Sequence, residues 1–132
     1  MKTTQVVRFL LAAGLGGALG SAFRLGASLL LVEVEPAAFP WSSFVVNLSG
    51  ALLIGLLAAI SQPGHRWMLG PAWQAFWLAG FCGGLTTFSF VSLELALMWQ
   101  GDQFLSAFVY LGLALGSWLI GVSLGWLLGT RA

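Results

Sequence analysis

The sequence predicts an all-α membrane protein with four transmembrane helices, the third of which is interrupted at its middle. Of the 132 residues, 59% are hydrophobic and 7% are charged, whereas a soluble domain carries roughly 25% charged residues. A membrane span needs about 20 apolar residues. Four segments meet this length, roughly residues 6–32, 41–61, 73–99 and 103–129. Residues 1–132 therefore form a single integral membrane domain.

Turn-forming residues separate the four predicted spans, and tryptophans lie near their ends. The turns are expected at Glu33-Val34-Glu35-Pro36, at Pro63-Gly64 and at Gly101-Asp102. Trp41, Trp67, Trp73 and Trp99 occupy positions typical of an aromatic belt at the membrane interface.

Several classes of function find no support in the sequence. No cluster of basic residues is present, which argues against a nucleic-acid partner. The single Cys82 has no second cysteine for an intrachain disulfide. The chain contains no P-loop, no HExxH, no Cys/His cluster and no serine–histidine–acid set, so we do not expect an enzyme.

The predicted break lies between Gly80 and Glu94, where the sequence reads GFCGGLTTFSFVSLE. Glycine lowers helix propensity, and Gly83-Gly84 followed by Thr86-Thr87 should interrupt the helix. In a membrane, unpaired backbone groups are tolerated only where protein or water surrounds them. The break is therefore expected inside the protein, with carbonyls available to hold a cation.

The first two spans each place polar and small residues on one face. Gly16, Gly20 and Arg24 follow four-residue spacing, and a GxxxG pair permits close helix contact. Arg24 is either a functional charge within the span or a side chain that extends to the interface. In the second span, Asn47 is either a hydrogen-bonding link between helices or a donor to an anion in a pore.

The second half of the third span and the fourth span carry further polar candidates. Glu94 is the only acidic residue within a predicted span; it either faces the interface or serves as a vestibule or proton-linked group. Tyr110 is either an interface aromatic or a pore-lining hydroxyl. Small residues recur at four-residue spacing in the fourth span and suit close packing, namely Ser117, Gly121, Gly125 and Gly129.

Three motifs in register resemble those of the Fluc (CrcB-like) fluoride channel family. Residues 16–24 read GGALGSAFR, similar to the family's GGxxGAxxR, and residues 43–50 read SFVVNLSG, similar to TLxVNxxG. Residues 80–89 read GFCGGLTTFS, similar to GfcGGfTTFS, and Glu94 matches the glutamate that closes this motif. The resemblance covers nearly the whole chain.

The resemblance implies a passive, fluoride-selective channel in the plasma (inner) membrane that lets cytoplasmic fluoride leak out. It implies an antiparallel, dual-topology dimer with two pores along the subunit interface. A structural sodium ion (Na+) at the dimer centre would be held by the backbone carbonyls of Gly83 and Thr86. The implied pore residues are Asn47, Phe88, Ser43, Ser89, Tyr110 and Phe90, and the implied vestibule residues are Arg24 and Glu94.

Two positions depart from the family pattern. The pattern TTFSxF places a second phenylalanine where this chain has Val91, and Phe90 comes one residue earlier. Phe90 should point about 100° away from the face of Val91, so this chain departs from the family at one aromatic contact per pore. The serine that the family tends to place one turn after the fourth-span tyrosine is Ala114 here, so this chain also departs from the family along part of the polar track.

Basic residues are biased toward one side of the predicted topology. The termini and the second loop share a side, which carries Lys2, Arg8, Arg66 and Arg131. The positive-inside rule then favours cytoplasmic termini. A dual-topology homodimer should show little such bias, so a homodimer and a heterodimer with an oppositely oriented paralogue both stay open. In a heterodimer, the partner would supply the ring that Val91 lacks.

The alternative function is a small proton-coupled four-span exporter. Such an exporter uses a membrane carboxylate as proton carrier, and only Glu94 qualifies by position. Flux that persists without a proton gradient distinguishes a channel from this exporter.

Overall fold

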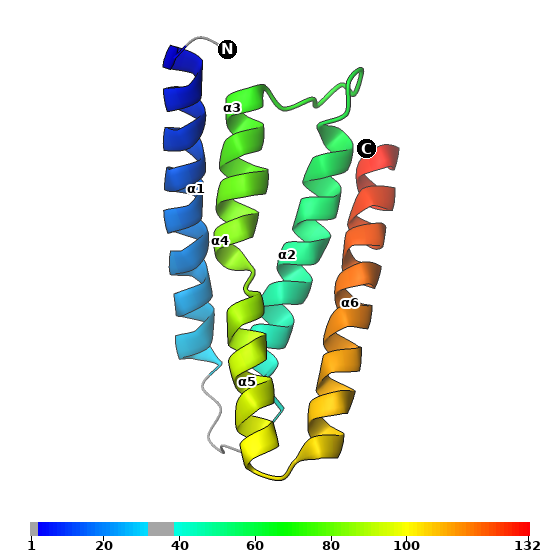
Figure 1. Ribbon diagram of the computed structural model, residues 1–132. Coiled ribbons are helices and arrows are strands. Elements are labelled where there is room, and N and C mark those ends of the chain that lie inside the picture. The colour runs from blue at the N-terminus through cyan, green and yellow to red at the C-terminus, as the bar shows by residue number, and fades with distance from the viewer. Residues whose placement is uncertain (1–2, 32–38) are drawn as a thin grey trace.

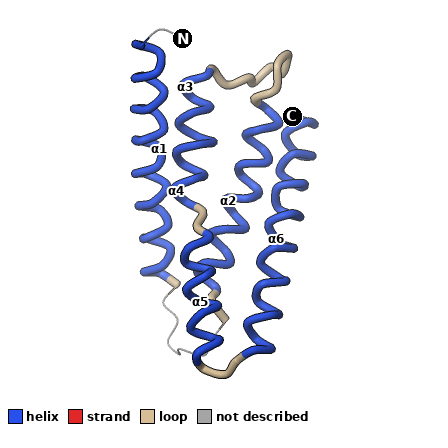
Figure 2. The backbone as a smooth tube through the Cα atoms, in the orientation of Figure 1, coloured by secondary structure: helices blue, strands red, loops and turns tan. Residues whose placement is uncertain are grey.

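The computed structural model describes residues 3–31 and 39–132, and within them it contains helices and connecting turns but no strand. Four long helical segments lie side by side (Figures 1 and 2). All four are long and apolar enough to cross a membrane. The end of the first predicted span and the predicted turn at residues 33–36 lie outside the described residues.

The helices agree with the predicted spans apart from small shifts at their ends. Helix α1 covers Thr3–Leu30, α2 covers Trp41–Ile60 and α6 covers Phe104–Arg131. The third span, Pro71–Gln100, consists of α3 (Pro71–Gln74), the π-helix η1 (Ala75–Cys82), α4 (Gly83–Leu85) and α5 (Phe88–Gln100). The predicted multi-pass, all-helical fold is confirmed.

Both described ends of the chain lie at the same end of the bundle, together with the connection from α2 to α3 (Figure 1). The turn from α5 to α6 lies at the opposite end. His65 in the α2–α3 connection places Nε2 3.1 Å from the carbonyl oxygen of Gly129 in α6. This hydrogen bond joins the second loop to the end of the last helix.

The third span is interrupted at Thr86 and Thr87, which are extended with ψ angles of 151° and 127°. The break follows the Gly83-Gly84 pair rather than including it, because both glycines remain in the short helix α4. A Cβ at Gly84 would lie 2.3 Å from the carbonyl oxygen of Gly17 in α1. Gly84 therefore permits close packing against α1, and the predicted interruption itself is confirmed.

The first half of the third span packs on α1 at backbone-to-backbone distance. A Cβ at Gly16 would lie 2.1 Å from the carbonyl oxygen of Phe76, and one at Gly20 would lie 2.1 Å from that of Phe81. The predicted close contact through Gly16-x-x-x-Gly20 is confirmed. Both carbonyls belong to η1, so the π-helix lies directly against the glycine face of α1.

Helix α2 packs on α6 in the same way. A Cβ at Gly125 would lie 2.0 Å from the carbonyl oxygen of Leu52, and one at Gly55 would lie 2.2 Å from that of Val122. The predicted packing role of the small residues in the fourth span is confirmed at Gly125. The bundle thus contains two tight helix pairs, α1 with the first half of the third span and α2 with α6.

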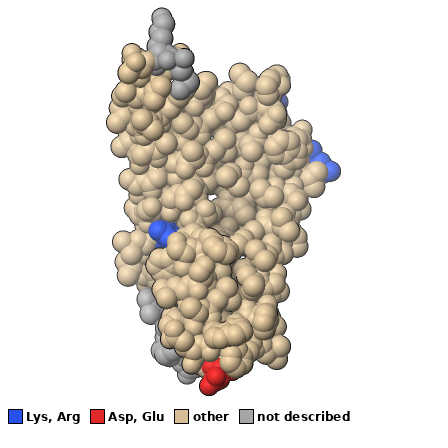
Figure 3. Space-filling view, viewed as in Figure 1, with Lys and Arg blue, Asp and Glu red and all other residues tan. Residues whose placement is uncertain are grey.

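The surface of the described residues suits a lipid environment. The face in Figure 3 shows few charged side chains and a hollow at the level of the break in the third span. Large apolar side chains such as Leu11, Leu105 and Leu119 are exposed along α1 and α6. In a bilayer these side chains face acyl chains.

We predict that Gly125→Ala destabilises the α2–α6 pair. Forcing an extra methyl group into a packed interface costs typically about 1–3 kcal/mol, and here it would meet the backbone of Leu52. The free energy of unfolding in detergent micelles measures the effect. Gly112→Ala in the same helix is the matched control, because a Cβ there meets nothing within 4 Å. Equal stabilities of the two variants would contradict the packing described here.

Candidate functional site

A pair of hydrogen bonds joins Asn47 in α2 to the backbone of Thr87 and holds the unwound segment of the third span against α2. Asn47 Nδ2 donates to the carbonyl oxygen of Thr87 (3.0 Å), and the Thr87 N–H donates to Asn47 Oδ1 (2.8 Å). Asn47 is buried, so its amide must be hydrogen-bonded to be tolerated there. A primary amide has two N–H groups, and the bond to Thr87 uses one of them.

The same contacts redirect the backbone donors of the broken helix. In a continuous helix, the N–H groups of Thr87 and Phe90 would donate to the carbonyls of Gly83 and Thr86, four residues earlier. Here the Thr87 N–H donates to Asn47, and the Phe90 N–H donates to Thr87 Oγ1 (3.4 Å), which caps α5. The carbonyls of Gly83 and Thr86 thus lose their helical donors at the point where the span unwinds.

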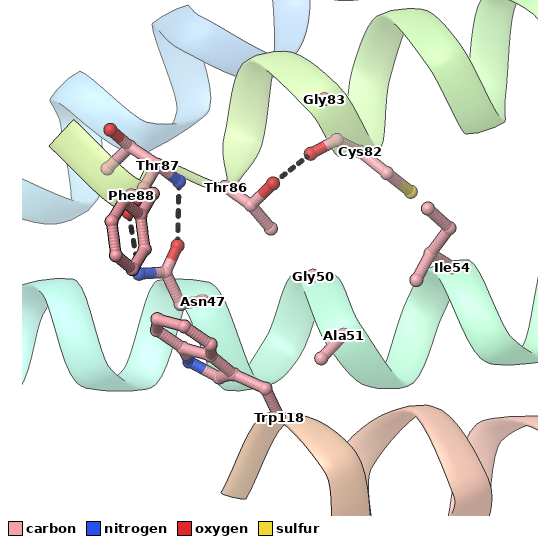
Figure 4. A pocket seen from close by; sticks show the side chains of 10 residues that line it. All are labelled: Asn47, Gly50, Ala51, Ile54, Cys82, Gly83, Thr86, Thr87, Phe88 and Trp118. Carbon is pink, nitrogen blue, oxygen red and sulfur yellow. Dashed lines mark hydrogen bonds between the residues drawn. The ribbon is translucent and has the colours of Figure 1, made fainter. Parts of the chain in front are cut away.

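The side chain of Thr86 contacts the backbone of the preceding turn and α2. Its hydroxyl donates to the carbonyl oxygen of Cys82 (2.9 Å), and its methyl group lies against Gly50, where a Cβ would come within 2.3 Å of it. Figure 4 shows this arrangement. Gly50, which the sequence places on one face with Ser43 and Asn47, therefore provides the space in which the break packs against α2.

A cavity of about 310 Å³ opens beside the break (Figure 4). Asn47 and Phe88 line it together with the two proposed sodium-binding residues, Gly83 and Thr86. Trp118 of α6 completes the wall, with its ring centroid 6.4 Å from that of Phe88 in an edge-to-face arrangement. The structure thus brings Asn47, Phe88, Gly83 and Thr86 to one cavity.

A second cavity, of about 140 Å³, lies on the other side of Asn47. Arg24, Ser43 and Phe90 line it, and Asn47 and Thr87 line both cavities. The guanidinium carbon of Arg24 lies 5.3 Å from the ring centroid of Phe90, within range of a cation–π interaction. The half-buried Arg24 therefore faces protein and a cavity rather than lipid alone.

Glu94 lies inside the bundle, with a partner on each of two neighbouring helices. Ser43 of α2 donates to Oε1, and Tyr110 of α6 donates to Oε2 (2.7 Å). Tyr110 is 1% exposed and Ser43 is buried. The sequence left two interpretations open for Glu94 and two for Tyr110. The structure places both side chains within the protein, and the Glu94 carboxylate links α2, α5 and α6.

The two departures from the family pattern meet in one cluster. Val91 and Ala114 are both fully buried and pack with Tyr110 in the core of the protomer. Val91 is therefore covered by its own chain. The small side chains at positions 91 and 114 allow α5 and α6 to pack around Tyr110.

The structure groups some of the predicted site residues and separates others. Phe88 and Phe90 line different cavities, and Ser89 lies with Phe90 and Arg24 in a third, shallower one. The sequence interpretation did not identify Thr87 as the partner of Asn47, nor Trp118 as a cavity residue. The signal for Trp118 was its position two turns after Tyr110, which places both on one helix face.

The fold and the site together define a class of small multi-pass transport protein. Broken helices whose freed backbone groups face a polar interior are typical of membrane transport proteins, and soluble monomers rarely expose this much contiguous apolar surface.

The model of the CrcB-like protein family, also described as Camphor Resistance (CrcB), matches residues 11–127. A fluoride-specific ion channel FluC from Rhodospirillum rubrum is 40% identical over 110 residues, which cover 83% of this chain and 85% of that protein. Fluoride-specific ion channel FluC 1 from Listeria monocytogenes (strain EGD-e) is 38% identical over 126 residues, 95% and 99% of the two chains. The chain belongs to the CrcB-like family, as the motifs predicted.

Proposed function

We propose that the protein is a passive, fluoride-selective channel through which cytoplasmic fluoride leaves the cell. The observation that carries this proposal is the position of Asn47, which lines both cavities and retains an amide N–H beyond its bond to Thr87. The relatives that are similar over most of their length are named fluoride-specific ion channels. Transport, rather than a chemical reaction, is the expected activity.

The chemistry of the two cavities suits a small, strongly hydrated anion. A pore must replace the hydration shell of the ion without holding the ion too tightly. The Asn47 amide supplies a neutral donor, and the ring edge of Phe88 carries a partial positive charge. Arg24 in the second cavity supplies a full positive charge at the approach to Asn47 and attracts anions toward it.

Ser43 extends the polar wall of the second cavity beyond Asn47, and the buried Tyr110 supports it from behind through Glu94. Ser43 lines the same cavity as Asn47 and Arg24, and its bond to Glu94 connects it to Tyr110. Because Glu94 accepts from both hydroxyls, it orients them and fixes α2 against α5 and α6. In this proposal Glu94 positions the polar track and does not itself meet the anion.

The carbonyls of Gly83 and Thr86 fit the structural sodium site implied by the family motifs. Both have lost their helical donors, and unwound carbonyls are the groups that coordinate Na+ in other membrane transport proteins. Within residues 3–31 and 39–132, no group of three His, Cys, Asp or Glu side chains comes together, which favours a backbone site. A bound sodium ion would supply a fixed positive charge at the dimer centre.

We propose that two subunits associate in antiparallel orientation in the plasma (inner) membrane. Phe88 and Phe90 are 62% and 50% exposed in the single chain, and Gly83 and Thr86 lie at an open cavity beside them. A second subunit would cover these rings and complete the sodium site. The partner is a second copy or an oppositely oriented paralogue, and efflux from the chain alone distinguishes the two.

We predict that Asn47→Asp lowers fluoride efflux from liposomes at least about tenfold, the effect of 1.4 kcal/mol on a barrier. The aspartate keeps the acceptor for the Thr87 N–H but loses the amide donors and adds a negative charge beside the anion path. Efflux of fluoride from liposomes that contain the unmodified chain is the reference, with chloride as the control anion.

Gln62→Glu is the matched control, because it makes a similar amide-to-carboxylate change at an exposed residue just beyond the end of α2. It should conduct like the unmodified chain once folding is verified by gel filtration. Normal fluoride efflux through Asn47→Asp would remove Asn47 from the pore. Efflux that stops when the proton gradient is collapsed would favour the exporter that uses Glu94.

We predict that Thr86→Val preserves the sodium dependence of efflux and of self-association to within about twofold. Valine keeps the shape of threonine but lacks the hydroxyl, which here donates to Cys82. The test compares protein dialysed into sodium-only and potassium-only buffers, with Thr130→Val as a control at the exposed end of α6. Loss of sodium dependence in Thr86→Val alone would make the hydroxyl, not the carbonyl, the ligand.

A further inference from the structure

The guanidinium of Arg24 lies against an aromatic ring of another helix. Its central carbon is 5.3 Å from the ring centroid of Phe90 in α5, a distance at which a cation is attracted to the face of a ring. Within the predicted spans the only acidic side chain is Glu94, whose two oxygens accept from Ser43 and Tyr110. The ring of Phe90 therefore stabilises a charge within the first span, where a charge is costly.

Phe90 and Phe88 point to opposite sides of α5. Two residues along an α-helix differ by about 200° in direction. Phe88 accordingly lines the cavity beside Trp118 of α6, whereas Phe90 lines the second cavity with Arg24 of α1. Phe90 therefore does not add a second ring to the cavity of Phe88.

The orientation of the Phe90 ring suits a cation. The face of an aromatic ring carries a partial negative charge and its edge a partial positive charge. Because the guanidinium of Arg24 lies over the ring of Phe90, the ring turns its negative face toward α1. A ring in this position holds a guanidinium and presents no positive edge to an anion on that side.

Arg24 and Phe90 together line two cavities. The second cavity is also lined by Asn47, and the shallower third cavity is also lined by Gly83 and Ser89. The side chain of an arginine near the end of a span can otherwise extend to the membrane interface. The contact with Phe90 instead keeps the charge at the cavity that Asn47 lines.

We infer that Phe90 is a positioning residue for Arg24, whose guanidinium it holds at the wall of the second cavity, and that its ring does not itself bind the anion. This inference rests on the proposed fluoride function and assigns a role to the ring that precedes Val91. A positive charge held at this wall raises the local concentration of anions near Asn47. Phe90 thus acts on anion entry through Arg24.

Phe90→Leu tests this role because it keeps an apolar side chain and removes the ring. We expect fluoride efflux to fall by about two- to fivefold at low ionic strength, the effect of one cation–π contact. The loss should shrink at high ionic strength, where salt screens the charge of Arg24. Phe90→Tyr retains the ring and should conduct like the unmodified chain.

Phe108→Leu is the matched control, since Phe108 is 63% exposed on α6 and lines neither the second nor the third cavity. Equal efflux from Phe90→Leu and Phe108→Leu at low ionic strength overturns the inference. A loss in Phe90→Leu that is equally large at low and high ionic strength assigns the ring to direct contact with the ion and also overturns it.

A spectroscopic measurement tests the contact itself and does not depend on conduction. Of the five lysines and arginines in the sequence only Lys2 is a lysine, so arginine labelled with ¹⁵N at Nε gives at most four N–H signals. Arg24→Lys identifies the signal of Arg24. Phe90→Leu, or Phe90→Met where the first does not fold, should move this signal because the ring current is lost.

Arg66 provides the internal reference, because its guanidinium carbon lies 5.3 Å from the ring centroid of Trp67 and its signal should stay in place. An Arg24 signal that does not move when the Phe90 ring is removed overturns the inference alone. An unmodified chain that passes no fluoride, alone or with a paralogue, overturns the proposed function instead, while the signal of Arg24 still reports its contact with Phe90.

Discussion

The two hydrogen bonds between Asn47 and the backbone of Thr87 are the interaction on which the rest of the site depends. An unwound segment within a membrane survives only if its backbone groups find partners. By engaging both the N–H and the carbonyl of Thr87, Asn47 stabilises the unwound conformation, and the Phe90 N–H is satisfied by the Thr87 hydroxyl. The carbonyls of Gly83 and Thr86 thereby lose their helical donors, as the proposed sodium site requires, and the remaining N–H of Asn47 is the donor that we propose for the anion.

Close backbone packing between helices fixes the position of the break within the bundle. Gly16 and Gly20 bring α1 against η1, and Gly125 brings α6 against α2. Asn47 lies between these cavities, and Glu94 holds α2, α5 and α6 together beneath them. A rigid frame of this kind keeps the weak donors that we propose for the anion in place, as selective yet rapid conduction requires.

The four spans, the broken third helix and the family follow from the sequence, because length, hydropathy and motif spacing are local properties. The details that depend on tertiary contact do not. Gly83-Gly84 stays helical because Gly84 packs on α1, and the π-helical first half of the third span has no local signal in its residues. The pairing of Asn47 with Thr87, the burial of Val91 with Ala114, and the contact of Arg24 with Phe90 all require knowledge of which faces of α1, α2, α5 and α6 meet.

The dual role of Asn47 can be measured directly, since it is the only asparagine in the sequence. Selective ¹⁵N labelling of asparagine gives one side-chain NH₂ group with two proton signals, observable in the reconstituted or detergent-solubilised protein. One proton should shift on addition of fluoride but not of chloride, while the other, which is bonded to the Thr87 carbonyl, stays in place. If neither proton responds to fluoride, Asn47 only stabilises the unwound segment and does not bind the ion. The proposed pore then does not pass through the two cavities that Asn47 lines.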